Sequence, residues 1–542
     1  MRYLGRFETL LPIYGAQATV PDTIPNARNG FKSVIDLKEL RGHRGAFAFK
    51  VSNDRIAIER PLSTAHDLFC RFHENSWWFS DQLTSLTVLD DRISPCPDFI
   101  AMYLVSSEEA TDLTPFCDIY SILPGTITTL SSDGSRKSQL IASESCVFPD
   151  DQIPNTLTDY LKTHCGSNGR YIIELSGGLD SSSILLSALQ QTSPDRISCY
   201  TYVDAHVQRS LDLEAAESLC SRYSILHRRI AIQSNVSIIS AARAYCGAPS
   251  RPSPLLLFLP LHNALLEDTA LLGRESAILN GHGGDHIFLA HPTLGAIVDH
   301  VGWRPSQMKK AVAIAGTFAK LTGMSWTDVL GGCLQEILAR MRSRLGRNSS
   351  IGALDAKYKI LSRSCILAGL ADRCRIHEVL RPERGSIPQM RRRRILMNAI
   401  HHGSLDRLTD SRYPTFYPFL NSQLLNWAMN RFESTTFDTR YRRLNQRQSF
   451  YARYKDEIFW RDGKGHFDGL VQRLIRTDIT DITPLVLNGV AAGLGYINPL
   501  AVESELNCCR LGGTPPTPST ILLITLEIYY SIWKRLEKNG GT

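Results

Sequence analysis

The run Tyr171-Ile172-Ile173-Glu174-Leu175-Ser176-Gly177-Gly178-Leu179-Asp180-Ser181-Ser182 decides the fold of this chain. An apolar strand ends here in a Ser-Gly-Gly turn, and a helix begins at once with Asp, Ser and Ser in its first turn. Such a turn directs several backbone N–H groups and the positive end of a helix dipole to one point, which suits a phosphate or pyrophosphate. The two glycines have no Cβ, so the backbone can approach the anion closely. The run therefore predicts a phosphate-binding turn.

The expected ligands of this phosphate site lie in the turn and directly after it. The serine hydroxyls can donate hydrogen bonds to phosphate oxygens, whereas the carboxylate of Asp180 would repel phosphate unless a cation lies between them. Mg²⁺ is therefore implied together with the phosphate. The GxxxxGK[ST] loop of kinases and ATPases does not occur in the sequence. The predicted phosphate-binding residues are Ser176, Gly177, Gly178, Asp180, Ser181 and Ser182.

Length and composition describe a globular protein with more than one domain. The chain has 542 residues, which exceeds the size of a single hydrophobic core. Hydrophobic residues make up 43% and charged residues 21%. A net charge of +7 is too small for this length to argue for nucleic acid. The 13 cysteines include no CxxC pair, which is typical of reduced thiols and predicts a cytoplasmic protein.

No targeting segment and no membrane span are expected. The first six residues contain no apolar region like that of a signal peptide. The apolar stretches near 254–266 and 520–533 are too short or too interrupted to cross a bilayer, since Pro260 and His262 lie in the first and Glu527 in the second. Both stretches are expected to form buried helices.

The pattern of elements changes at residues 148–154, which predicts a boundary there. Residues 1–147 are rich in strand patterns. The following part alternates strands and helices, which predicts a parallel sheet covered on both faces, and from about residue 300 the chain is mostly helical. Strands are expected at 45–51, 55–59, 75–79, 119–130, 171–175, 197–203, 227–232 and 277–280, and helices at 156–164, 179–190, 211–222 and 254–272.

A second glycine-rich turn follows a later strand of the predicted sheet. It reads Ile278-Leu279-Asn280-Gly281-His282-Gly283-Gly284-Asp285-His286, and taken alone it could be only a tight turn. In an open α/β sheet, however, the carboxyl ends of the strands line the ligand crevice. We therefore expect Gly283 and Gly284 to bind phosphate. Asp180 and Asp285 are expected to face each other and to hold Mg²⁺.

Three motifs together resemble the synthetase domain of the asparagine synthetase B superfamily, which is of the ATP pyrophosphatase type. They are SGGLDSS, GHGGD and Tyr417-Pro418-Phe419-Leu420-Asn421, and the family usually has Asp in place of Asn421. Thr114–Phe116 and Leu123–Gly125 resemble the end of the family's N-terminal amidohydrolase-like domain. The resemblance therefore covers most of the chain.

The resemblance implies both a fold and a reaction class. It implies an α/β protein with an N-terminal αββα Ntn-amidohydrolase-like domain over residues 1–147. Residues 148–542 would form an ATP-pyrophosphatase-type synthetase domain, with a parallel sheet and helical extensions. Members of this family split ATP between the α and β phosphates and transfer AMP to a carboxylate. An AMP-forming amide ligase that uses ATP and Mg²⁺ is therefore implied.

One departure from the family pattern points to a subfamily. Glutamine-dependent members carry a nucleophilic Cys after the initiator Met, whereas this chain has Arg2, so glutaminase activity is not expected. The amine would then come from the substrate itself, as it does in ring-forming members. Gly281–His286 and Arg461–Phe467 are most similar to the corresponding segments of lasso-peptide macrolactam synthetases.

This similarity implies a lasso peptide cyclase. Such an enzyme adenylates the Asp or Glu side-chain carboxylate of a precursor peptide and closes an amide with the peptide's α-amine. The implied partners are the precursor peptide, a leader peptidase and a leader-binding protein. A small-molecule cyclase of the β-lactam synthetase kind and an ammonia-dependent asparagine-synthetase-like ligase share the same motifs and remain alternatives. A non-enzymatic scaffold has no need for two phosphate-side acids.

The resemblance also implies a catalytic cation. Ring-forming members carry a lysine in a late glycine-containing loop, where it can stabilise developing negative charge, and Lys464 has that context here. Without the family it would be interpreted as an exposed loop lysine. A general base is not identified, because Pro414 occupies the place of the family's Glu. The candidates for the base are His282, His286, His401, His402, Asp406 and Glu383.

One charged run has two interpretations. Arg391–Arg394, with Arg381 and Arg384 nearby, could bind phosphate or an acidic peptide, or it could form a solvated helix face. The aromatic residues of 413–419 and Trp427 are expected in the core rather than in a substrate wall.

Overall fold

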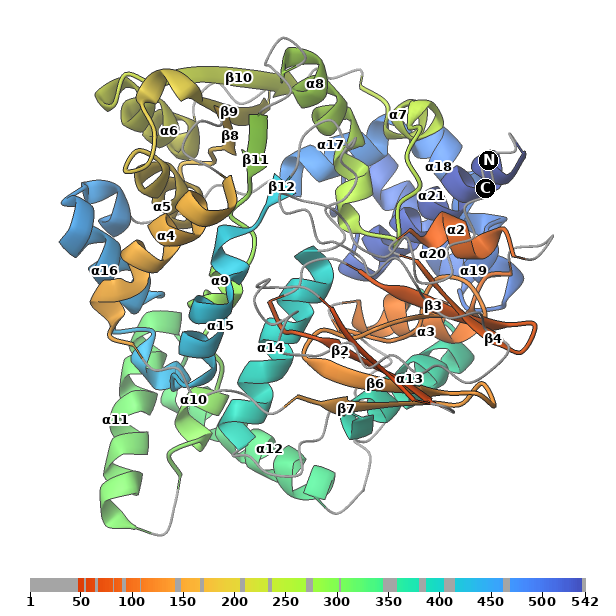
Figure 1. Cartoon of the computed structure of the whole chain (residues 1–542), viewed down its shortest axis with the longest axis horizontal. Coiled ribbons are helices and arrows are strands. Elements are labelled where there is room, and N and C mark those ends of the chain that lie inside the picture. Colours follow the sequence, from red (N-terminus) through yellow and green to blue (C-terminus); the bar gives the residue numbers. More distant parts are fainter. Residues whose placement is uncertain are drawn as a thin grey trace.

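The computed structural model is an α/β protein with a five-stranded parallel sheet and two antiparallel sheets (Figure 1). In this view the parallel sheet lies at the upper left and the antiparallel sheets at the lower right. The structure describes residues 47–538 apart from 53–54, 64–66, 81, 90–93, 108, 142–147, 166–169, 205–209, 233–235, 270–275, 302–303, 345–357, 380–386, 404–414 and 462–467.

All neighbouring strands of the five-stranded sheet are parallel, in the order β10-β9-β8-β11-β12. The strands are β8 (Arg170–Glu174), β9 (Ile197–Asp204), β10 (Leu226–Ile232), β11 (Ser276–Leu279) and β12 (Thr415–Phe416). The first four confirm the strands expected in this region. β12 is not predicted by the sequence, because two residues are too few to give a periodic pattern.

Helices fill the connections between these strands. They are α4 (Ile153–Cys165), α5 (Leu179–Ala188), α6 (Leu211–Arg222), α7 (Ile238–Ala244) and α8 (Leu259–Thr269), which follows the 3-10 turn η3 (Pro254–Phe258). The helices expected near 156–164, 179–190 and 211–222 are confirmed. The long helix expected over 254–272 is divided into η3 and α8, with Pro260 at the second position of α8, where proline is tolerated.

Residues along the central strands alternate between two hydrophobic cores. Tyr171 and Ile173 of β8 belong to the core that includes residues of α4, α5 and α6, whereas Ile172 belongs to the core on the other side. In β11, Leu279 and Ile278 divide in the same way. The parallel sheet is therefore buried on both faces, as its continuous apolar strands predict.

The described residues between 47 and 141 contain the two antiparallel sheets. Their orders are β1-β2-β6-β7 and β4-β3-β5. β1 and β2 pair with Ala48 opposite Glu59, which confirms the first two strands predicted for this region. Ile58 and Cys70, one from each sheet, belong to a shared core. The strands are β1 (Ala48–Val51), β2 (Arg55–Arg60), β3 (Phe69–His73), β4 (Ser76–Ser80), β5 (Ile119–Ser121), β6 (Thr126–Ser131) and β7 (Arg136–Leu140).

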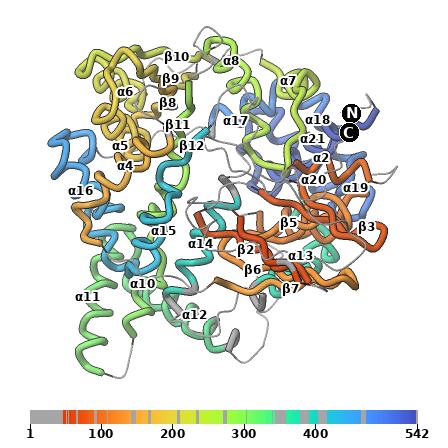
Figure 2. Tube along the Cα trace, in the orientation of Figure 1, coloured from red at the N-terminus to blue at the C-terminus, as the bar shows by residue number. Residues whose placement is uncertain are grey.

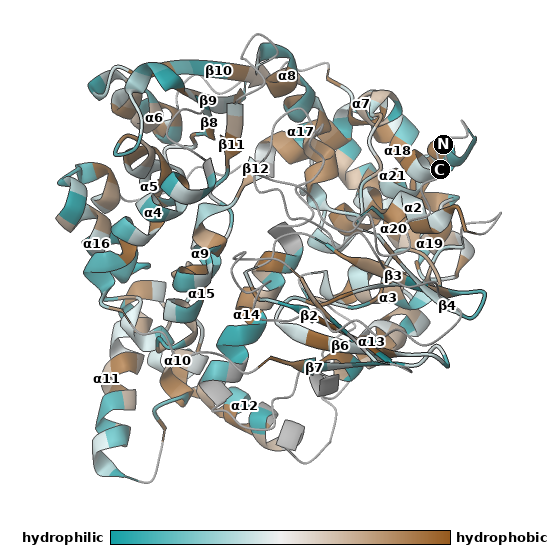
Figure 3. Ribbon diagram, in the orientation of Figure 1, coloured by the Kyte–Doolittle hydropathy of each residue, from teal (hydrophilic) through white to brown (hydrophobic). Residues whose placement is uncertain are grey.

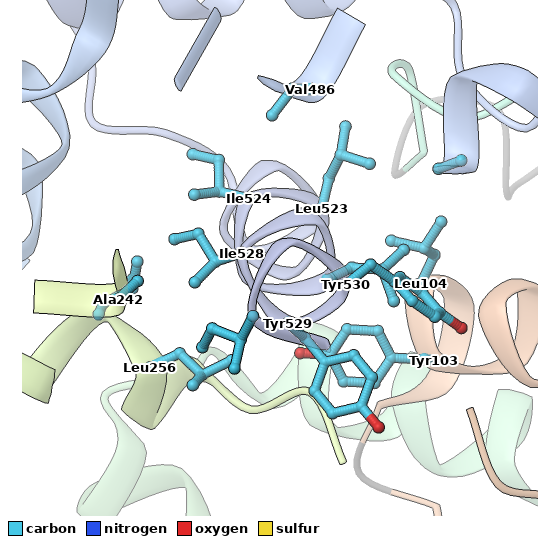
Figure 4. Packing of buried hydrophobic residues seen from close by; sticks show 14 of the residues in the cluster. Tyr103, Leu104, Ala242, Leu256, Val486, Leu523, Ile524, Ile528, Tyr529 and Tyr530 are labelled. Carbon is cyan, nitrogen blue, oxygen red and sulfur yellow. The ribbon is translucent and has the colours of Figure 1, made fainter. Parts of the chain in front are cut away.

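The N-terminal region packs against helices from the other end of the chain, as the red and blue parts of the trace show in Figure 2. Helix α3 (Pro97–Ser106) contacts α13 (Arg363–Val379) and α21 (Pro518–Lys538). Tyr103 of α3 lies close to α21 in Figure 4, and its hydroxyl is 2.9 Å from the Thr525 hydroxyl. One hydrophobic core therefore includes both ends of the described chain.

The remaining helices surround these sheets, and most of them carry both hydrophobic and hydrophilic residues (Figure 3). The helices after residue 300 confirm the expectation of a mainly helical region there. The remaining helices are α2 (Leu83–Thr87), α9 (Gly284–Ile287), α10 (Gly295–Val298), α11 (Pro305–Thr322), α12 (Trp326–Arg344), α14 (Ile387–Gly403), α15 (Ser422–Met429), α16 (Leu444–Tyr454), α17 (Asp468–Thr477), α18 (Ile479–Leu487), α19 (Val490–Gly493) and α20 (Pro499–Arg510).

In the part of the chain that the structure describes, no helix is both long and apolar enough to cross a membrane. The apolar stretch near 520–533 forms the buried helix α21, and Glu527 lies inside it with 2% of its surface exposed. The Glu527 carboxylate accepts hydrogen bonds of 2.8 Å from the N–H groups of Val490 and Ala491 at the start of α19. Burial raises the pKa of Glu527 to about 7, although these two N–H donors oppose the shift.

Glu527 is expected to make the stability of the fold depend on pH. A folded-state pKa above the unfolded value means that the folded protein binds the proton more tightly, so its stability falls as the pH rises from about 4.5 to 7. The free energy of unfolding falls by on the order of 3 kcal/mol once the pH has passed both pKa values. Thermal melts at pH 5 and pH 8 should show a smaller pH dependence for Glu527→Gln than for the unmodified protein. Equal pH dependence of the two would contradict the assignment.

Candidate phosphate-binding site

The two glycine-rich turns follow neighbouring strands at the point where the direction of winding changes. The chain passes from β8 outward to β9 and β10, and then returns to β11 on the other side of β8. The carboxyl ends of β8 and β11 therefore adjoin while their connections leave in opposite directions, which is where ligands bind in open α/β sheets. The structure thus brings together the two turns that the sequence singled out.

The first turn is held in a shape that requires glycine. Gly177 has φ +70°, and a Cβ at this position would overlap the backbone oxygen of Asp212. The Ser181 hydroxyl accepts a hydrogen bond of 3.2 Å from the Ser176 N–H and lies 3.2 Å from the Ser176 hydroxyl. Ser176 is exposed. Ser182 is fully buried, and its hydroxyl has no hydrogen-bond partner among the residues that the structure describes.

The second turn packs tightly against the first. A Cβ on Gly284 would overlap the Asp180 carboxylate, and a Cβ on Gly281 would come within 3.1 Å of the Asp180 Cβ. Gly283 has φ +97°, and a Cβ there would come within 2.5 Å of Leu420. Because only hydrogen fits at these positions, the glycines set the close approach of the two turns.

Arg443 joins the two acidic residues of the site. Its guanidinium donates hydrogen bonds of 2.9 and 2.8 Å to the two carboxylate oxygens of Asp180, and it also forms an ion pair with Asp285. Gln446 donates a further hydrogen bond of 2.9 Å to Asp180. Burial lowers the pKa of Arg443, but the charges of Asp180 and Asp285 outweigh this effect and leave it above its ordinary value. Asp180 and Asp285 therefore share one site, although a guanidinium lies between them.

A hydrogen-bond network braces the floor of the site. Glu174, at the end of β8, accepts hydrogen bonds of 2.7 Å from the Tyr202 hydroxyl and 2.8 Å from the Asn280 amide. Asn280 in turn accepts a hydrogen bond of 2.7 Å from the N–H of His282. Burial raises the pKa of Tyr202, and the neighbouring Glu174 adds to this effect. Three strands are thus cross-linked where the two turns begin.

Arg461 connects the first turn to a late part of the chain. Its guanidinium donates a hydrogen bond of 2.6 Å to the Gly177 carbonyl and forms an ion pair with Asp212 at the start of α6. Arg447 donates a hydrogen bond of 3.1 Å to the Arg461 carbonyl. The predicted catalytic residue Lys464 lies outside the described residues, three positions after Arg461 in the sequence.

Asn421 has a structural role that explains why it can replace Asp. It is the N-cap of α15, and its side-chain oxygen accepts a hydrogen bond of 2.9 Å from the Leu424 N–H. Its amide donates a hydrogen bond of 2.7 Å to the Pro418 carbonyl. Asn and Asp are about equally good N-cap residues, so this cap does not need the charge.

The structure separates the candidates for the general base. The His282 imidazole lies 2.8 Å from the Ala399 carbonyl, so it has a structural hydrogen bond. His286 lies on α9 with its ring 5.5 Å from that of His282, and His401 is 98% buried on α14. Glu383 and Asp406 lie outside the described residues, as does the side chain of His402.

The arginine run of α14 binds other parts of the protein. Arg391 forms ion pairs with Asp299 and Glu433, and Arg392 donates hydrogen bonds to the carbonyls of His286 and Ala428. Burial lowers the pKa of Arg392 to about 9. These two arginines are therefore neither a solvated face nor a free anion site. The other two pair with the N-terminal region, Arg393 with the Gly125 carbonyl and Arg394 with Glu109. Arg381 and Arg384 lie outside the described residues.

The acidic residues of the site suit a cation that binds together with phosphate. Among the described residues, no cluster of three or more His, Cys, Asp or Glu side chains could hold a metal ion. Mg²⁺, however, is usually held by one or two carboxylates and the phosphates of the substrate. Asp180 and Asp285 fit this donor set, because two carboxylates meet at one site, where the Arg443 guanidinium pairs with both of them.

The sequence does not identify Arg443, Gln446 and Arg461 as residues of the site. They are far from the turns along the chain, and no local pattern indicates which of many arginines returns to the site. Arg461 could have been suspected, since it begins the segment that resembles the late loop of the family. No local sequence pattern indicates Arg443.

Two adjacent glycine-rich turns lie at the carboxyl edge of a parallel sheet, where open α/β proteins bind their ligands. The sequence pattern of the asparagine synthase family matches residues 152–515, which is more than half of the chain. The protein therefore belongs to the asparagine synthase family. No curated protein matches the chain.

Two solved structures show limited similarity. One is a glutamine-dependent NAD+ synthetase from Acinetobacter baumannii in complex with ADP, at 18% identity over 33% of this chain, with a TM-score of 0.20. The match spans only 33% of that enzyme's chain. The other is an NH3-dependent NAD synthetase from Campylobacter jejuni subsp. jejuni NCTC 11168 in complex with the nitrate ion. It is 15% identical over 44% of this chain and 100% of its own, with a TM-score of 0.21.

Gly284→Ala is expected to destabilise the protein, because the new methyl group would displace the Asp180 carboxylate. The expected loss in the free energy of unfolding is about 1–3 kcal/mol, measured by urea denaturation. Gly493→Ala is a suitable control, since no atom lies within 4 Å of its added Cβ. Equal stability of both variants would show that the two turns do not approach as closely as described.

Asn421→Ala is expected to lower the free energy of unfolding by about 1 kcal/mol, because the first turn of α15 loses its cap. Asn421→Asp should retain more of this stability, since it keeps the oxygen that accepts the Leu424 N–H. The same denaturation experiment compares the three proteins. Asn421→Ala as stable as the unmodified chain would refute the capping role.

Proposed function

We propose that this protein is a macrolactam synthetase of the lasso peptide cyclase kind. The observation that carries the ligase chemistry is the meeting of Asp180 and Asp285, from two glycine-rich turns, on the single guanidinium of Arg443. The cyclase specificity rests on the resemblance of Gly281–His286 and Arg461–Phe467 to that subfamily. The synthetase domain is proposed to cover 148–542, consistent with a family match that begins at residue 152, and the Ntn-like domain to cover 1–147.

The proposed first step activates a carboxylate of the substrate. A carboxylate oxygen of a peptide Asp or Glu attacks the α-phosphorus of ATP, the bond to the β-phosphate oxygen breaks, and pyrophosphate leaves. The backbone N–H groups at Gly177, Gly178 and the start of α5 would hold the pyrophosphate. Gly283 and Gly284 would bound it on the other side. Mg²⁺ held by Asp180 and Asp285 would neutralise part of the phosphate charge.

The second step closes the ring. The α-amine of the peptide attacks the acyl carbon, AMP leaves with the electrons of the acyl–oxygen bond, and the amine releases a proton. Holding the amine close to the acyl-adenylate can lower the barrier by about 7–11 kcal/mol. Lys464 would stabilise the negative charge that develops on the acyl oxygen and on phosphate. The start of its loop is tied to the first turn through Arg461.

The described thiols of the N-terminal region do not include an activated nucleophile for glutamine hydrolysis. Glutamine hydrolysis needs a thiolate nucleophile. Burial raises the pKa of Cys70 to about 12 and that of Cys96 to about 11, and it also raises that of Cys117. None of these described thiols is therefore activated. The precursor peptide, a leader peptidase and a leader-binding protein are the proposed partners.

The reaction can be tested with the protein, ATP, Mg²⁺ and a linear candidate peptide. Mass spectrometry should show a product that has lost one water, together with stoichiometric AMP and pyrophosphate. Conversion of a free small amino acid, or incorporation of added ammonia, would replace the macrolactam proposal with the corresponding ligase. Release of ADP and phosphate would overturn the adenylation chemistry itself.

Lys464→Ala is expected to reduce the rate of ring closure by about 100- to 1,000-fold, because one cationic stabiliser of the transition state is lost. Its melting temperature should be unchanged. Lys455→Ala provides a matched control, since Lys455 is exposed and ends α16 outside the site. If both variants turn over at the normal rate, Lys464 has no catalytic role.

A further inference from the structure

Helix α12 presents a hydrophobic face that is largely exposed in the part of the chain that the structure describes. One side of the helix is buried, because Val329 and Cys333 pack in a core with α10 and α11. The helix lies at the lower edge of the molecule in Figure 1, away from the parallel sheet. A surface helix of a monomeric protein normally carries polar residues on its outer side, so an apolar outer side indicates an interface.

The exposed apolar residues of α12 form one continuous ridge. They are spaced four residues apart, so they lie in one row along the helix. Their exposed fractions range from 40% to 60%. The ridge consists of Trp326, Leu330, Leu334 and Leu338, and Met341, 55% exposed, extends it by one turn.

Beside this ridge, on the same side of the helix, lies a second row of exposed residues. The next row, one residue further along, begins with Gly331, which is exposed, and a Cβ there would have no atom within 4 Å. Gln335 follows one turn later and is also exposed. Gly331 therefore leaves room beside the ridge, and the same apolar row of a second copy can pack against it around a twofold axis.

We propose that α12 is the dimerisation surface of this protein and that its occupant is α12 of a second copy. Self-complementary surfaces form twofold contacts, in which the residue on the axis meets its own counterpart. Leu334 is the middle of the ridge. In an antiparallel pair it faces the partner's Leu334, and Leu330 faces the partner's Leu338.

The area of the ridge is sufficient for such a dimer. Large apolar residues have on the order of 200 Å² of surface each. With the exposed fractions given above, the ridge offers about 500 Å² per copy. An interface core that is about 65% apolar would then bury roughly 1,500 Å² in total. Stable complexes bury about 1,200–2,000 Å².

The charges beside the ridge favour a protein partner over an anionic membrane. Between Trp326 and Met341 the charged residues are Asp328, Glu336 and Arg340, and Arg340 is paired with Glu336 and Asp299. Helices that lie on anionic lipid surfaces are rich in Lys and Arg on the polar side. The acidic residues would therefore oppose binding to such a surface.

Two opposite charges at Leu334 test the proposal directly. Light scattering should show a dimer for the unmodified 60.6 kDa chain at micromolar concentration and monomers for Leu334→Arg and for Leu334→Glu. An equimolar mixture of the two variants should regain the dimer, because Arg then faces Glu across the axis. Regain of the dimer also shows that both variants are folded.

Leu500→Arg is the matched control, since Leu500 is a 78% exposed leucine on α20, and this variant should remain dimeric. Three results would overturn the proposal. The first is an unmodified protein that is monomeric, for example because its own chain covers the ridge. The second is a dimer formed by either Leu334 variant alone. The third is a mixture of the two variants that stays monomeric. Binding of the unmodified monomer to phosphatidylserine vesicles would identify a membrane as the occupant instead.

Discussion

The adjacency of β8 and β11 is the constraint on which the site depends. Each strand ends in a glycine-rich turn with an acidic residue, and the sheet places these ends side by side where the winding reverses. Neither turn forms the site alone. Only the strand order brings Asp180 and Asp285 within reach of one guanidinium. The same order aims the start of α5 at the space between the turns, where a phosphate is favoured by the helix dipole.

Arg443 balances the negative charges of Asp180 and Asp285 in this arrangement. A buried cation is stable only when it is paired, and here the carboxylates of Asp180 and Asp285 pair with it. Its backbone has φ +56°, a conformation that costs a non-glycine residue about 1–3 kcal/mol. The protein thus holds a positive group, at a cost, between two acids that would otherwise repel each other. In the proposed reaction, the cation bound with the phosphate would take over that balancing charge.

Much of the fold follows from the sequence, whereas the site follows only in part. Continuous apolar runs predict β8 to β11, and period and turn residues predict α4, α5 and α6, because these signals are local. The two turns are visible for the same reason. Arg443 and Arg461 are not, since their contacts join distant parts of the chain. The arginine run of α14 is visible in the sequence, but its role is not. A charged run suggests a solvated surface or an anion site, whereas these arginines pair with Asp299, Glu433 and buried carbonyls.

The two turns are proposed to support attack on the α-phosphorus of ATP. Exchange of labelled pyrophosphate into ATP, in the presence of a carboxylate peptide that lacks a free α-amine, measures that step without ring closure. Exchange by the unmodified protein, absent from a folded Asp180→Asn variant, is the predicted result. Absence of exchange in the unmodified protein while ADP accumulates would contradict it.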